Sequence, residues 1–113
     1  MTPLQFPFQR KQRIVSKSDF NSIFTSGKKR TVGPLLILTK SNSLNQTRLG
    51  LSVPKRVGNA VVRNKIKRRC REAFRTSQQD LPKGLDILVT ARPHTPLQTD
   101  DYSRLIKQGV CND

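Results

Sequence analysis

The sixteen residues from Ala60 to Arg75, AVVRNKIKRRCREAFR, combine regular apolar spacing with dense positive charge. On a helical wheel at about 100° per residue, one side carries Val62, Ile66, Cys70, Ala73 and Phe74. The other side carries Asn64, Lys65, Lys67, Arg68, Arg71 and Arg75, while Arg63 and Arg69 flank the apolar stripe. The pattern predicts a helix that packs one side on a core, turns a cationic side outward, and begins after Asn59 as N-cap.

The cationic side of this helix has two interpretations, a solvated surface or a binding site for a polyanion. Like charges four residues apart, such as Lys67 and Arg71, destabilise a helix by a few tenths of a kcal/mol. The single acid, Glu72, is placed to relieve the repulsion of Arg68 and at most that of Arg69 as well. Because a merely solvated face gains from mixed signs, nearly uniform charge favours a polyanion. Asn64 is able to hydrogen-bond a base edge or a 2′-hydroxyl.

The charge of the whole chain supports the same interpretation. With 22 Lys and Arg against 7 Asp and Glu, the 113 residues carry a formal charge of +15. Residues 55–76 contribute +8 and residues 1–34 contribute +6, whereas residues 77–113 sum to −1. Nucleic acid is the usual partner of such a charge, and an anionic membrane surface is the alternative. We expect the last third of the chain to support the fold.

Several other classes of protein are disfavoured. The longest apolar run, Leu35–Leu38, is far too short to span a membrane, and the N-terminus does not resemble a secretory signal. Cys70 and Cys111 are interpreted as reduced thiols of a cytoplasmic protein, without the spacing of a zinc site. His94 is interpreted as a loop residue, because a histidine needs positioned partners to act in catalysis. We expect no catalytic side chains and no metal site in the chain itself.

The remaining segments predict an α+β domain. Residues 1–15 are expected to form a flexible basic arm, and residues 16–113 a single domain. A helix over residues 16–27 has Ser16 as cap and Gly27 as stop. Strands are expected at 34–40 and 47–53, joined by the polar SNSLNQ turn into an antiparallel hairpin, and again at 85–91. Residues 28–34 are expected to form a basic connector that has room for a short strand.

A last helix is expected over residues 99–109. Thr99 is its cap, Asp100 and Asp101 lie in the first turn where the helix dipole favours them, and Gly109 is its stop.

Two phenylalanines of the first helix have two interpretations. Phe20 and Phe24 lie four residues apart and share a face with Ile23. Aromatic residues at helical spacing are most often core. The alternative is a stacking platform for unpaired bases, with cations around it.

The central segment resembles the bacterial ribonuclease P protein component. RLGLSVPKRVGNAVVRNKIKRRCREAFR, residues 48–75, carries that family's Arg-Asn-basic motif at Arg63, Asn64 and Lys65, with the family's GNAV lead-in before it. SDFNSIFTSGKK resembles its first helix, and GLDILVTARP resembles its last strand. The similarity extends over about residues 12–110.

This resemblance implies an α/β sandwich with element order αβββαβα, of the type seen in the second domain of ribosomal protein S5. It implies a four-stranded mixed sheet, three helices and a left-handed βαβ crossover, against the usual right-handed rule. The implied function is that of the protein subunit of ribonuclease P, in the bacterial cytoplasm. There the RNA subunit, with bound Mg²⁺, removes the 5′ leader of precursor tRNA; no obligate protein partner and no membrane are implied.

The resemblance also assigns candidate residues to two RNA surfaces. The RNA subunit would contact Arg63, Asn64, Lys65, Lys67, Arg68 and Arg71. The precursor tRNA leader would lie in a cleft between the first helix and the sheet, against Lys17, Phe20, Phe24, Arg48 and Ser52.

Three other functions compete with this one. A ribosomal or general RNA-binding protein has the same composition, and only the Arg63–Lys65 motif argues against it. A protein-only nuclease would need a carboxylate or histidine cluster, which the sequence does not suggest. A membrane-surface helix would expose large apolar residues, but here these are needed for the core.

Overall fold

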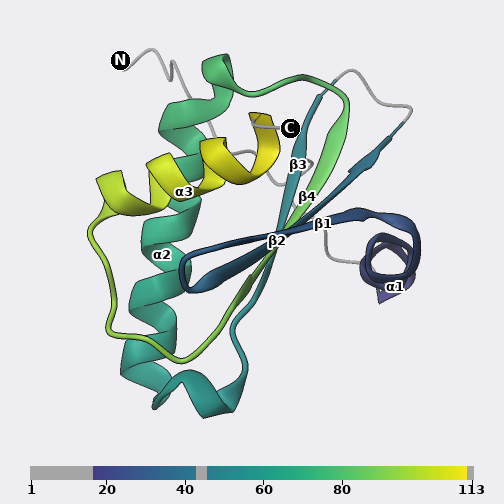
Figure 1. The fold of residues 1–113 in the computed structure, drawn as a ribbon. Coiled ribbons are helices and arrows are strands. Elements are labelled where there is room, and N and C mark those ends of the chain that lie inside the picture. Colours follow the sequence, from purple (N-terminus) through teal and green to yellow (C-terminus); the bar gives the residue numbers. More distant parts are fainter. Residues whose placement is uncertain (1–16, 43–45, 112–113) are drawn as a thin grey trace, which may run out of the picture.

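The computed structural model describes residues 17–42 and 46–111 of the chain (Figure 1). The element order αβββαβα is confirmed, with two short 3-10 helices added. The elements are α1 Lys17–Ser26, β1 Lys28–Val32, β2 Leu35–Ser41, β3 Arg48–Ser52, η2 Lys55–Val57, α2 Ala60–Ser77, η3 Gln78–Asp80, β4 Leu85–Ala91 and α3 Thr99–Cys111. The expected arm, residues 1–15, and the proposed cap Ser16 lie outside the described residues.

The four strands form one mixed sheet in the order β1-β2-β4-β3. β1 pairs with β2 and β2 with β4, both antiparallel, while β3 and β4 are parallel. The expected hairpin between β2 and β3 is therefore wrong, because β4 lies between them. β4 pairs with β2 on one side and β3 on the other, and it is buried at most of its positions on both faces, as is usual for a strand in the middle of a sheet with helices on both faces.

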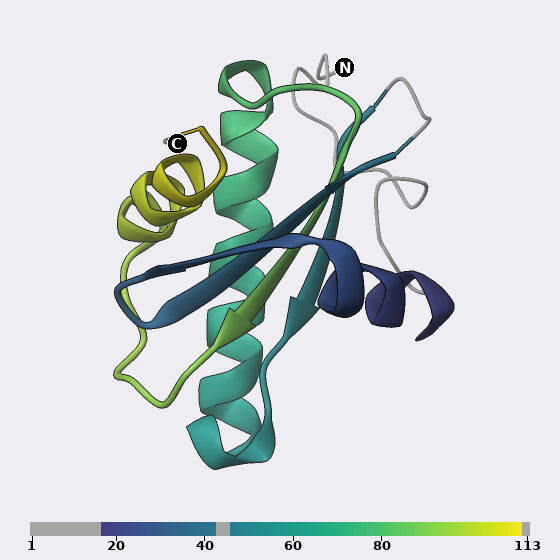
Figure 2. The same ribbon diagram turned by 45° about the vertical axis from the view of Figure 1, so that its right-hand side comes forward.

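α2 connects the parallel strands β3 and β4. In Figure 2 both strands run downward, α2 lies behind the sheet, and β4 lies to the left of β3. The crossover is therefore left-handed, as the family resemblance implied.

The helices cover the two faces of the sheet unequally. α2 and α3 lie on one face and α1 lies on the other (Figure 1). The main core fills the α2–α3 face, and the expected stripe of α2 is part of it: Ile66, Cys70, Ala73 and Phe74 are at most 1% exposed. Ile23 of α1 forms a smaller core with Leu38 and Leu88 on the opposite face. No helix within the described residues is long and apolar enough to cross a membrane.

α1 ends where expected, at a glycine that the packing requires. The Gly27 amide donates to the Ile23 carbonyl oxygen over 2.8 Å. A Cβ at Gly27 would lie 2.5 Å from that oxygen and 2.9 Å from the Thr39 carbonyl oxygen of β2. Only glycine therefore lets α1 turn into β1 this close to β2.

We expect Gly27→Ala to lower the free energy of unfolding by about 1–3 kcal/mol, because two backbone carbonyls must move. Urea denaturation followed by circular dichroism measures this. Thr25→Ala, two residues earlier on the exposed side of α1, is the control and should change stability by less than about 0.5 kcal/mol. Equal stability of Gly27→Ala and the wild type would contradict the close approach.

The last helix differs from expectation at both ends. The Gln98 carbonyl accepts the first helical hydrogen bonds, and the Gln98 amide donates to the Asp101 carboxylate over 3.3 Å. The cap is thus Gln98, with Thr99 the first helical residue. Gly109 does not stop the helix, which continues to Cys111. Gly109 is instead a contact point, since a Cβ there would lie 2.6 Å from Ile37 Cδ1.

Candidate RNA interface

The position and rotation of α2 follow from its N-terminus and its apolar stripe. Asn59 is the N-cap as expected, and its Oδ1 accepts a hydrogen bond from the Val62 amide over 3.0 Å. Burial of Ile66, Cys70 and Phe74 then fixes which side of the helix faces the sheet. The opposite side, with its cations, faces away from the core.

Most of the candidate RNA-subunit residues lie together on this outer side. Asn64 and Arg68 are exposed, and Lys65, Lys67 and Arg71 are half-buried. Lys65, Lys67 and Arg68 make no hydrogen bond or ion pair with any residue that the structure describes. We call Asn64, Lys65, Lys67, Arg68 and Arg71 the cationic face of α2.

Arg63 and Arg69 differ from the rest because each is tied to the protein backbone. Arg63 Nε donates to the Gly58 carbonyl oxygen over 3.1 Å. Arg69 Nη1 donates to the Leu97 carbonyl oxygen over 2.6 Å, which anchors the loop before α3. Arg69 therefore stabilises the loop before α3, and Arg63 stabilises the turn before α2.

The single acid of α2 does not neutralise the cationic face. Glu72 pairs with Arg75, whose Nε donates to its Oε1 over 3.0 Å, and not with Arg68 as expected. This hydrogen bond and the Arg75 charge lower the pKa of Glu72. The cations from Lys65 to Arg71 thus remain without an acidic partner among the described residues.

Val61 is a feature of this surface that the sequence analysis missed. Its side chain is 70% exposed, the highest value for a large apolar residue in the described chain. On the wheel it falls between Arg68 and Lys65, so the signal was present in the spacing. Val61 places an apolar contact point beside the cations.

Cys70 lies on the buried side of α2 and is a free thiol. Burial raises its pKa to about 12, against a smaller opposite effect of the Arg71 charge.

Because the thiolate is the reactive form of a cysteine, we expect almost no reaction of Cys70 with Ellman's reagent at pH 8 in the folded protein and full reaction in urea. The measurement uses a Cys111→Ser variant, so that only Cys70 is counted; rapid reaction of the folded variant would contradict this burial.

The face of the sheet that carries α1 holds the other candidate residues. Register pairs Arg48 with Asp86, Gly50 with Leu88 and Ser52 with Thr90. Leu88 packs on α1 through Ile23, so these pairs face the α1 side. Arg48 and Ser52 are thus brought to one surface, as the expected leader cleft requires.

α1 contributes Phe24 to this side of the molecule. Phe24 is 40% exposed, whereas its neighbour Ile23 is buried. The core interpretation is therefore wrong for Phe24, and the stacking interpretation stays a prediction. Lys17 and Phe20 belong to α1, but their side chains are outside what the structure describes.

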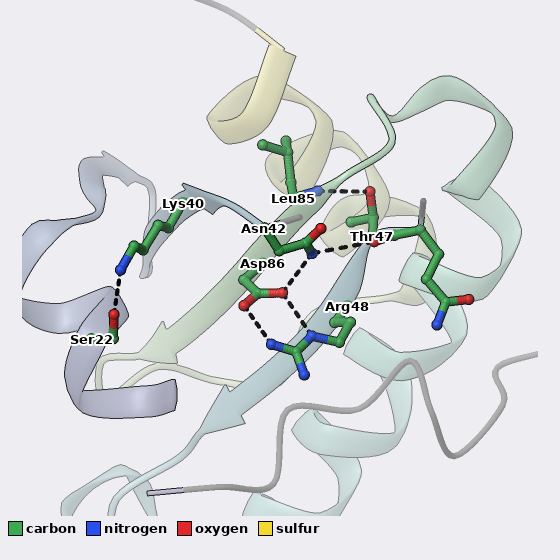
Figure 3. A network of polar contacts seen from close by, with 8 residues as sticks. Ser22, Lys40, Asn42, Thr47, Arg48, Leu85 and Asp86 are labelled. Carbon is green, nitrogen blue, oxygen red and sulfur yellow. Dashed lines mark hydrogen bonds and ion pairs between the residues drawn. The ribbon is translucent and has the colours of Figure 1, made fainter. Parts of the chain in front are cut away.

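Arg48 is held by a polar network at the start of β3 (Figure 3). Its Nε and Nη2 donate to the two carboxylate oxygens of Asp86 over 2.8 and 2.6 Å. Asn42 Nδ2 donates to Asp86 Oδ1 over 2.8 Å. Nearby, Lys40 of β2 donates to the Ser22 hydroxyl of α1. The network links β2, β3 and β4 and orients the Arg48 guanidinium on the α1 side.

The environment of Asp86 favours its charged form. Burial acts to raise its pKa, but hydrogen bonds from Arg48 and Asn42 and the nearby positive charges outweigh burial, so the pKa is lowered. Asp86 thus stays ionised and paired at neutral pH. The sequence analysis missed this pair because its members are 38 residues apart; the signal was one charge in each of two otherwise uncharged strands.

His94 has structural partners. Its Nδ1 lies 2.7 Å from the Arg92 carbonyl oxygen, which requires a proton on Nδ1, and its Nε2 lies 2.8 Å from the Tyr102 hydroxyl. The Leu97 amide donates to that hydroxyl over 3.1 Å. These hydrogen bonds of His94 and Tyr102 therefore stabilise the loop between β4 and α3. Within residues 17–42 and 46–111, no three His, Cys, Asp or Glu side chains gather as metal ligands would.

Comparisons with known proteins identify the family of this chain. A model of the Ribonuclease P family matches residues 8–110. The ribonuclease P protein component of Aliivibrio salmonicida is 34% identical over 104 residues, 91% of this chain and 89% of that protein. A Staphylococcus aureus RNase P protein mutant has a TM-score of 0.80 at 32% identity, covering 88% and 86% of the two chains.

The fold of a Thermotoga maritima relative is also shared. That RNase P protein has a TM-score of 0.75 at 31% identity, covering 83% of this chain and 90% of its own. The family match, the sequence identity and the common fold together show that this chain belongs to the ribonuclease P protein family.

Proposed function

We propose that this chain is the protein subunit of a ribonuclease P, which binds the RNA subunit and the 5′ leader of precursor tRNA. The observation that carries the proposal is the cationic face of α2, where Lys65, Lys67 and Arg68 have no protein partner among the described residues. Cations left unpaired on a rigid helix cost stability by mutual repulsion. Phosphates of the RNA subunit would remove this repulsion and release counterions.

The α1 side of the sheet is the proposed leader surface. Phe24 offers an exposed ring on which an unpaired base is able to stack. Arg48 is oriented by Asp86 toward the same side and would contact a leader phosphate, with Ser52 further along β3. Lys17 and Phe20 are assigned to this surface on the family resemblance alone.

The chemical step is assigned to the RNA subunit. Mg²⁺ bound by that RNA would supply an activated water and stabilise the leaving oxygen. This chain would bind and orient the substrate, with the leader held on the α1 side and the RNA subunit on α2.

Reconstitution tests the proposed function. The purified chain, a bacterial ribonuclease P RNA and a precursor tRNA with a labelled 5′ end are mixed at low Mg²⁺. We expect leader removal when all three are present, and little with the RNA alone. Leader removal by the chain alone, or no stimulation of the RNA, would overturn the proposal.

Phe24→Ala tests the leader surface. We expect the affinity of the holoenzyme for precursor tRNA to fall by about 1–2 kcal/mol because a stacked base loses its partner. Affinity for mature tRNA, which lacks the leader, should stay unchanged, and so should the melting temperature. Thr25→Ala on the same helix serves as control; equal losses for both tRNAs would contradict the leader contact.

A further inference from the structure

The free edge of the sheet at β1 carries a second group of cations. Among the strands that the structure describes, β1 pairs only with β2, at the opposite edge of the sheet from β3. Its first three residues are Lys28, Lys29 and Arg30. None of the three makes a hydrogen bond through its side chain or an ion pair with the residues that the structure describes. This cluster is separate from α2 in the fold and belongs to none of the surfaces assigned above.

Two adjoining hollows lie beside these cations. One, of about 380 Å³, is lined by Lys28, Lys29, Arg30, Thr39 and the end of α3 at Gly109 and Val110, with Ile37 at its base. The other, of about 310 Å³, shares Lys28, Thr39 and Val110 and adds Ser26, Lys40, Ser41 and Leu85. Of these, the Ser26 hydroxyl donates to the Ser22 carbonyl oxygen and Lys40 donates to the Ser22 hydroxyl. No Asp or Glu is among the described residues that line either hollow. Together they offer the positive charges of β1 and the hydroxyls of Thr39 and Ser41 around an open depression.

The strand register concentrates the charge at the larger hollow. Lys28 lies opposite Thr39 and Arg30 lies opposite Ile37. Side chains two residues apart point to the same face of a strand, so Lys28 and Arg30 stand on the α3 side with these residues. Two cations on one side of an edge strand repel each other unless an anion lies between them.

Edge protection is the simpler account of these charges. Lysines on an edge strand prevent pairing with another sheet. That role explains charge on β1 but does not require a hydroxyl-lined hollow next to it. It also gives no reason why the described residues that line both hollows include no carboxylate.

We propose that the β1 hollow is a second phosphate-binding site for RNA, with Lys28 and Arg30 as its main contacts. The inference rests on the proposed function, and it adds a contact surface at the sheet edge away from α2. α3 lies next to both α2 and β1 (Figures 1 and 2) and separates the hollow from the cationic face of α2. A phosphodiester backbone fits because the site offers charge and hydroxyls without an aromatic ring for a base.

The test compares two double variants with equal loss of charge. Lys28→Gln/Arg30→Gln removes two cations at β1, and Lys83→Gln/Arg104→Gln removes two exposed cations elsewhere. Affinity is measured against salt concentration in two arms, the chain with ribonuclease P RNA and the reconstituted holoenzyme with precursor tRNA. Melting temperatures of both variants confirm that they fold.

In one of the two arms, we expect Lys28→Gln/Arg30→Gln to bind its RNA about tenfold more weakly than the wild type at about 0.15 M salt. The slope of log Kd against log salt should fall by about 1–2 in the same arm. The arm that changes identifies which RNA supplies the phosphate. Equal behaviour of the two variants in both arms would overturn the second site. Retained leader removal at saturating protein would show that the proposed function stands even if this site fails.

Discussion

Replacing Asp86 by alanine is expected to lower the free energy of unfolding by about 2–4 kcal/mol, because the largely buried Arg48 guanidinium loses the carboxylate that pairs with its charge. The Asp86 side chain is 9% exposed and that of Arg48 19%, so water replaces the lost contacts poorly. Asn42 loses an acceptor in the same variant. Urea denaturation monitored by circular dichroism gives the value.

The control for Asp86→Ala is Glu72→Ala. It breaks a carboxylate–arginine pair of the same type on the exposed side of α2, where such pairs contribute about 0–1 kcal/mol. Equal effects of the two substitutions would show that the Arg48–Asp86 pair is no more than a surface contact.

The same pair predicts how stability depends on pH. The pKa of Asp86 is lower in the folded state than in the unfolded chain. The contribution of the Asp86 charge to the free energy of unfolding is therefore complete above the pKa of the unfolded state, near pH 4. It is lost as the pH falls toward the pKa of the folded state. Asp86→Asn should show a smaller loss of stability than the wild type between about pH 4 and pH 2. An unchanged profile would contradict the pairing.

Reversing three charges on α2 is the functional change with the largest expected effect. Lys67→Glu/Arg68→Glu/Arg71→Glu should weaken binding to ribonuclease P RNA by about 100-fold or more at about 0.15 M salt, because attraction to phosphates becomes repulsion. These side chains lie outside the core, so the melting temperature should change little. Filter binding with labelled RNA measures the loss.

The matched control reverses three cations in other parts of the chain. Lys83→Glu/Arg92→Glu/Arg104→Glu gives the same net charge, and all three side chains are exposed. We expect a much smaller loss of affinity, about tenfold or less, since only the long-range field changes. Equal losses in the two variants would mean that net charge alone, and not the surface of α2, binds the RNA.

The sequence predicts the parts of this fold that depend on local periodicity. The spacing of Ile66, Cys70 and Phe74 defines both the helix and its buried side, and the structure confirms all three. Asn59 as cap follows from the same local pattern. The charge on the other side of α2 is equally a local property, so the cationic face was predictable residue by residue.

Contacts between distant segments were not predictable in this way. A polar turn between β2 and β3 is compatible with a hairpin and equally with a connection that leaves room for β4 between the two strands. The structure has the second arrangement, with β4 between β2 and β3 and buried at most positions on both faces. Gly109 shows the same limit: glycine stops many helices, but here it allows α3 to touch Ile37. The pairing of Arg48 with Asp86 likewise depends on the order of the strands.

The salt dependence of binding to ribonuclease P RNA tests the central role of α2 most directly. Arg68 is exposed and unpaired among the described residues, and so is Lys83, which serves as the control. We expect Arg68→Ala to weaken binding and to lower the slope of log Kd against log salt by about 1, the value for one phosphate contact. Lys83→Ala should leave the slope at the wild-type value. An unchanged slope for Arg68→Ala would contradict the account of α2 as the surface that binds the RNA subunit.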